Sequence, residues 1–153
     1  MQEQEVKGEE MTRWNKRRKL LSLCADRLGV PVSALNSKRD IRRTLKPLRD
    51  RAIVRLLQLD LTTAQVSRLR VGDVDASAGM VLVPVMCGGK IRRVPVEMDV
   101  ECAGAITKWM SVRPMVCSGV EALFVTLHAN RPAGTISDRS IRSVLADWAA
   151  AAA

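Results

Sequence analysis

Cations that could bind phosphate lie at three places in this chain. Lys90, Arg92 and Arg93 follow a Gly-Gly pair, and Arg139 and Arg142 have the i, i+3 spacing of one helix face. A third group comprises Arg17, Arg18, Lys19, Arg42 and Arg43. Such side chains neutralise DNA phosphates, and an Arg can also read guanine in the major groove. We predict that these residues contact DNA; a solvated basic surface is the alternative for each group.

Side chains that could perform catalysis or bind a metal are scarce. The sequence has no Tyr and a single His, His128. Its four cysteines, Cys24, Cys87, Cys102 and Cys117, include no C-x-x-C pair, so we interpret them as reduced thiols. We therefore predict no metal and no cofactor.

The charge is unevenly distributed along the sequence. The formal net charge is +9, and twelve Lys and Arg against three Asp make residues 11–50 the most basic stretch. A basic block of this density favours a polyanionic partner, most simply double-stranded DNA. Neither a secretory signal nor an apolar run long enough for a membrane span is present. The sequence thus predicts a cytoplasmic protein with no membrane contact.

The elements that must position these cations follow from the apolar periodicity and the turn signals. Helices are expected at residues 14–28, 37–45, 48–59, 62–69, 99–112 and 137–149. Pro47 marks a helix boundary. Strands are expected at residues 80–85, 91–96 and 123–127, with residues 86–90 linking the first two into a hairpin. Pro84 and Pro95 predict edge positions or bulges in this hairpin.

These elements predict an α+β fold, mainly helical, with a small antiparallel sheet of about three strands. The core must be aliphatic, because aromatic residues make up only 3% of the sequence. Trp14, Trp109 and Trp148 are expected to pack in that core, and Val100 to face inward on its helix. Thr62 and Gln65 have the spacing of a capping box, which predicts that Thr62 begins a helix.

Residues 48–148 resemble the catalytic domain of tyrosine recombinases, also called phage integrases. The similarity rests on RDRAIVRLL at residues 49–57, LRVGDVD at 69–75, GGKIRRVPV at 88–96, Leu123-Phe124 and SDRSIRSVL at 137–145. The resemblance implies a fold like the N-terminal part of that domain. It also implies that the hairpin and the helix near residue 140 approach DNA.

The departures from the family pattern fall on its catalytic positions. Thr62 stands where the family keeps its first catalytic Arg, Gln65 at the acidic residue three later, and Cys87 at the catalytic Lys. The single His, His128, is followed by Ala129, Asn130 and Arg131 in a predicted loop, and the family's H-x-L-R-H motif and its nucleophilic Tyr are absent from the sequence. A phosphotyrosyl intermediate therefore has no nucleophile, and the phosphate loses its cationic partners.

We expect residues 1–12 to be a disordered acidic tail, residues 13–47 a basic helical segment and residues 48–153 a truncated recombinase-like domain. The predicted function is DNA binding without catalysis, as an accessory or repressor-like factor of a mobile element. The alternative is an interaction module, or one piece of a split enzyme, that docks on a full-length recombinase or on a second copy of itself.

Overall fold

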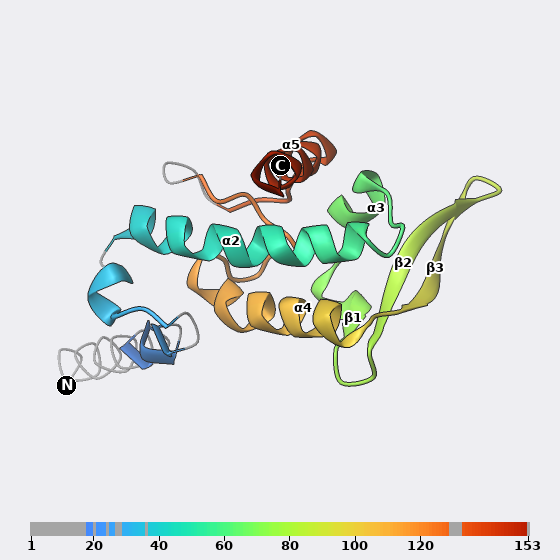
Figure 1. Ribbon diagram of the computed structural model, residues 1–153. Helices are drawn as coiled ribbons and strands as arrows, with labels where there is room; N and C mark the ends of the chain where they lie inside the picture. The colour runs from blue at the N-terminus through green and yellow to red at the C-terminus, as the bar shows by residue number, and fades with distance from the viewer. Residues whose placement is uncertain are drawn as a thin grey trace, which may run out of the picture.

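A computed structural model describes residues 18, 19, 21–23, 25, 26, 29–35, 37–128 and 133–152. Its centre is the long helix α2 (Lys38–Leu57), which packs between α4 (Val100–Val112) and α5 (Asp138–Ala152). A two-stranded hairpin projects from the end of this helical body near the C-terminus of α2 (Figure 1). The α+β fold class, mainly helical with a three-stranded antiparallel sheet, is confirmed.

Helix α2 begins as the sequence predicts but does not stop at Pro47. Ser37 caps it, because the Ser37 hydroxyl accepts a hydrogen bond from the Asp40 amide at 3.1 Å. The predicted interruption at Pro47 is wrong, since one helix of 20 residues replaces the two expected at 37–45 and 48–59. A proline inside a helix costs about 3 kcal/mol. Leu45 and Leu56, fully buried on either side of Pro47, offset that cost by packing.

Helix α3 (Thr63–Ser67) follows α2 after a short break. The predicted capping box is confirmed: the Gln65 amide donates to Thr62 Oγ1 at 3.1 Å, and the Thr62 amide donates to Gln65 Oε1 at 2.9 Å. Asp60 turns the chain before this cap with a φ of 66°. Helix α3 is shorter than residues 62–69, because Arg68 caps its C-terminus and Arg70 adopts an extended conformation that pairs with Ala122.

The hairpin consists of β2 (Met80–Cys87) and β3 (Lys90–Glu97), and a short β1 (Val74–Asp75) pairs with the start of β2. The pairing of β2 with β3 continues without a bulge along both strands. Hydrogen-bonded and non-hydrogen-bonded residue pairs alternate along an antiparallel ladder, and the pair beside the turn is hydrogen-bonded. Counting from that pair, Pro84 and Pro95 both lie in non-hydrogen-bonded pairs. Each missing proline N–H therefore removes no bond from the β2–β3 ladder.

The predicted strand at residues 123–127 is wrong, because β1 is the third strand of the sheet. This segment is extended, but helix side chains satisfy much of its backbone. Trp109 Nε1 donates to the Leu123 carbonyl at 2.8 Å, and Arg49 Nη1 donates to the Val125 carbonyl at 3.1 Å. The Trp109 ring also stacks on Phe124, with ring centroids 6.4 Å apart. The segment thus lies in the core between α2 and α4.

Three predictions about apolar residues have different outcomes. Trp109 is fully buried, as expected. Val100 is 89% exposed, since it opens α4 after the Asp99 cap, before the helix reaches the core. Trp148 is 39% exposed, because it lines an open hollow between the end of α5 and α2. Trp14 lies outside the described residues.

Candidate nucleic-acid interface

The hairpin turn is tighter than the sequence predicts. The strands extend to Cys87 and Lys90, so only Gly88 and Gly89 connect them instead of the five residues 86–90. Both glycines have positive φ, 58° and 77°, the combination that a type I′ turn requires and that other residues rarely adopt. The turn therefore fixes Lys90 directly opposite Cys87, at the outer end of the hairpin (Figure 1).

The three hairpin cations divide between the two faces of β3. Side chains alternate along a strand, so Lys90 and Arg92 share one face and Arg93 lies on the other. Lys90 and Arg92 are exposed. The Arg93 guanidinium forms an ion pair with the buried carboxylate of Asp73, which also accepts a hydrogen bond from the Arg70 amide at 2.9 Å. Arg93 thus ties the hairpin to the body, while Lys90 and Arg92 face solvent.

A groove with a volume of about 440 Å³ separates the hairpin from the turn that follows α3. Arg68, Arg70 and Arg93 line it together with one acidic residue, Glu121. Among our candidate DNA contacts only Arg93 belongs to this groove; Arg68 and Arg70 are not among those candidates. The positions of Arg68 and Arg70 in the sequence do not predict this groove, because the groove forms between segments that are distant in the chain. One contact between these segments is the hydrogen bond that the Val71 amide donates to the Glu121 carbonyl.

The two α5 cations lie at its N-terminal end, beside α3. Ser137 caps the start of α5, with the Ser140 amide donating to Ser137 Oγ at 3.1 Å. Arg142 Nη2 donates to Asp138 Oδ2 at 2.9 Å, whereas Arg139 is exposed. The Thr63 hydroxyl, followed by Arg142, holds the pKa of Asp138 below its usual value. Helix α3 contacts both α5 and β2, so the hairpin and α5 present their cations on either side of α3.

At the family's catalytic positions the structure places neutral groups. The Thr62 side chain is engaged in capping α3, and Gln65 completes that cap. Cys87 is an exposed thiol at the hairpin end. His128 is exposed, and residues 129–132 lie outside the described part of the chain. Within that part, no three His, Cys, Asp or Glu side chains are grouped as metal ligands would be.

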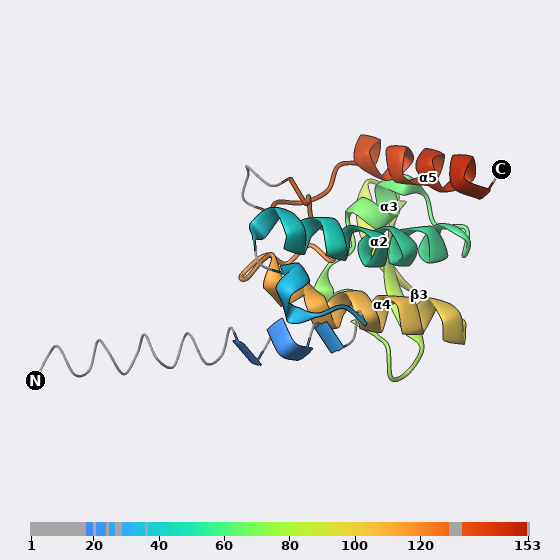
Figure 2. The ribbon, with the colours of Figure 1, turned by 60° about the vertical axis from the view of Figure 1, so that its left-hand side comes forward.

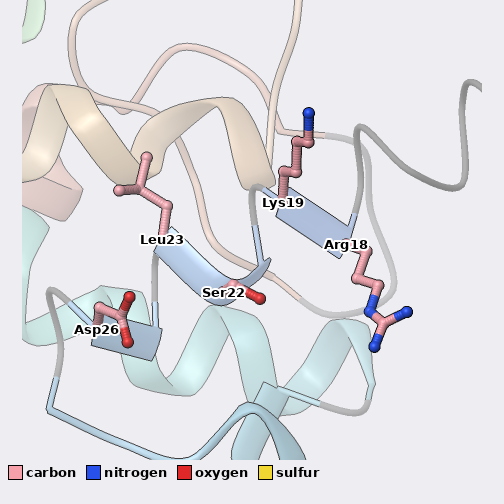
Figure 3. A pocket seen from close by; sticks show the side chains of 5 residues that line it. All are labelled: Arg18, Lys19, Ser22, Leu23 and Asp26. Atoms are coloured by element: carbon pink, nitrogen blue, oxygen red, sulfur yellow. The ribbon is translucent and has the colours of Figure 1, made fainter.

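The predicted N-terminal cations lie away from the hairpin. Arg17 lies outside the described residues. Arg18 and Lys19 line a hollow of about 630 Å³ with Ser22, Leu23 and Asp26. Figure 3 shows their charged ends pointing in different directions, with no shared point at which one ligand would be held. Arg42 and Arg43 lie on the N-terminal half of α2, and they form part of a separate surface described below.

The described cysteines other than Cys87 are poorly suited to act as nucleophiles. Burial raises the pKa of the Cys102 thiol to about 11, and burial also raises that of Cys117. Both thiols are therefore poor nucleophiles at neutral pH. Cys24 lies outside the described residues. No helix in the described part of the chain is both long and apolar enough to cross a membrane.

Comparison with known proteins supports a recombinase-like fold. No protein-family model and no curated protein matches the sequence. Among solved structures, the crystal structure of XerA recombinase is similar, with a TM-score of 0.54 and 26% sequence identity. The match covers 72% of this chain and 38% of the XerA chain, so this chain corresponds to less than half of that protein. The similarity indicates recombination ancestry.

Proposed function

We propose that this protein binds double-stranded DNA without cleaving it, and that it acts as a repressor or accessory factor of a mobile element. The observation that carries the proposal is the placement of cations on both sides of α3. The hairpin holds Lys90 and Arg92 on one side, and α5 holds Arg139 on the other. All three are exposed, and together they offer positive charge to the phosphates of one duplex.

The absence of catalysis is proposed from the residues at the positions where the family performs its chemistry. A strand exchange needs a nucleophile, cations on the non-bridging oxygens and an acid for the leaving oxygen. Thr62 is an uncharged helix cap and Cys87 carries no permanent charge. The sequence offers no Tyr to attack the phosphate. Binding would therefore act by occupying a DNA site.

Mobility-shift titrations with a short duplex, at two salt concentrations, test the proposal together with a nicking assay on supercoiled DNA. The expected result is binding that weakens steeply as salt rises, with no nicked or covalently attached product. Absence of binding at low salt would refute the DNA-binding proposal. Strand cleavage by pure protein would refute the non-catalytic part alone.

A second candidate function is docking on a full-length recombinase. Leu145 of α5 is 43% exposed and Trp148 is 39% exposed, which leaves apolar area open to a protein partner. This function predicts capture of a purified recombinase in the absence of DNA. Leu145→Ser with Trp148→Ser should abolish that capture while leaving salt-dependent DNA binding intact.

A further inference from the structure

The N-terminal half of α2 carries a second, separate concentration of positive charge. Five cations fall within nine residues, and we call this set the α2 patch: Lys38, Arg39, Arg42, Arg43 and Lys46. At 3.6 residues per turn, successive residues are about 100° apart, so these five positions occupy an arc of roughly 140°. The helix predicted at residues 37–45 already contains four of these cations, and the continuation of α2 through Pro47 places Lys46 on the same face.

Most of the α2 patch is open to solvent. Lys38, Arg39 and Arg43 are exposed. Lys46 bonds to the buried Asp50 at 2.8 Å, yet its side chain remains 51% exposed. The one acidic residue in the first turn of α2 is Asp40, whose backbone amide is engaged in the Ser37 cap. A polyanion approaching this face therefore meets a surplus of cations.

The α2 patch lies far from the hairpin surface. Helix α2 has 20 residues. At 1.5 Å per residue it is about 30 Å long. The hairpin projects beyond the C-terminal end of α2, and the patch lies at its N-terminal end (Figure 1). The view turned by 60° shows the same helix α2 running between α5 and α4 (Figure 2).

The surface of α5 that joins the two cationic regions has no positive charge. Residues 143–152 include no Lys or Arg and one acidic residue, Asp147. Asp147 and Trp148 lie beside Arg43 and Lys46, where the end of α5 meets α2. Exposed Leu145 precedes them on α5. A phosphate backbone running from the hairpin to the patch along α5 would cross an apolar and acidic strip, which contributes no counterion release.

We propose that the α2 patch binds a second duplex, so that one molecule bridges two DNA segments. This inference rests on the proposed DNA binding of the hairpin and α5 surface. The partner is committed to duplex DNA because the five cations extend along one helix face, as a phosphate backbone requires, whereas the hollow beside Arg43 and Lys46 carries the carboxylates of Asp50 and Asp147. Bridging follows from two cationic surfaces that one straight duplex does not join.

The test is a capture experiment with full-length protein, a bead-bound duplex and a fluorescent free duplex. Wild-type protein should bind the beads and retain the free duplex. The variant with Arg39→Gln and Arg43→Gln should lose most of that retention, at least about fivefold, while still binding the beads. The matched control replaces Arg51 and Lys108 by Gln, which removes the same charge from exposed positions outside both surfaces. Melting curves verify that both variants are folded.

The outcomes separate this inference from the proposed function. No protein on the beads refutes the proposed function and this inference with it. Protein on the beads without retention of the free duplex refutes bridging alone. Equal retention by wild type and the Arg39/Arg43 variant, or an equal loss in the Arg51/Lys108 control, overturns the assignment to the α2 patch. A patch-dependent change in end-to-end distance of a single doubly labelled duplex would indicate bending and also overturn it.

Discussion

Neutralising the free hairpin cations should lower the salt dependence of DNA binding by a calculable amount. The variant replaces Lys90 and Arg92 by Gln. Both are exposed on the same face of β3, whereas Arg93 is engaged with Asp73. Each phosphate neutralised contributes about 0.9 to the slope of log affinity against log salt, so two lost contacts reduce that slope by about 1.8. Between about 50 and 200 mM salt, this difference amounts to roughly a 12-fold change in relative affinity.

Fluorescence anisotropy with a labelled duplex at four salt concentrations measures this slope directly. The control is the Arg51 and Lys108 double variant, which has the same net charge but leaves the hairpin intact. A slope that stays at the wild-type value in the hairpin variant would show that Lys90 and Arg92 do not touch phosphate. An equal reduction in the control would show that only total charge matters.

Three further predictions concern stability and reactivity. Asp50→Asn should cost about 3 kcal/mol in urea unfolding, because the Arg49 side chain, 7% exposed, loses its counter-charge; a cost below about 1 kcal/mol would contradict this. Cys87 should react rapidly with a thiol reagent while Cys102 stays protected until unfolding. Mass-spectrometric mapping of the modified cysteines tests this, and faster modification of Cys102 than of Cys87 would contradict the placement of Cys87 at the exposed end of the hairpin. The pKa of Asp138 is lowered from 3.8, so its contribution to stability is present above that pH and is lost as the pH falls through the lowered pKa. Asp138→Asn should therefore reduce the acid-induced fall in Tm, and an unchanged Tm profile would refute its role.

The sequence is sufficient where a short-range rule decides the structure. Ser37, Thr62 and Ser137 all cap helices, because a side-chain oxygen and an amide three residues on are fixed by local geometry. The hairpin follows equally from β-branched runs on both sides of a Gly-Gly pair. Only the turn length was wrong, since a two-residue turn and a five-residue loop share the same glycines.

The sequence is insufficient where tertiary packing overrides a local preference. Pro47 disfavours a continuous helix, yet packing of the residues on both sides keeps α2 intact. Residues 123–127 have strand-like composition, but Trp109 and Arg49 take the carbonyls that a neighbouring strand would otherwise bond. The groove beside Arg68 and Arg70 likewise depends on segments about fifty residues apart in the chain. No periodicity in the sequence encodes such contacts.

Thr62 connects the fold to the proposed absence of catalysis. Helix α3 has five residues, too few to be stable without tertiary packing and a good cap. Thr62 and Gln65 supply that cap reciprocally, and such caps contribute roughly 0.5–2 kcal/mol. An Arg at this position would provide a phosphate contact but no side-chain acceptor for the Gln65 amide. The chain therefore favours stability of α3 at the position where the family begins catalysis. It keeps exposed positive charge on the hairpin and α5, where the proposed DNA binding requires no nucleophile.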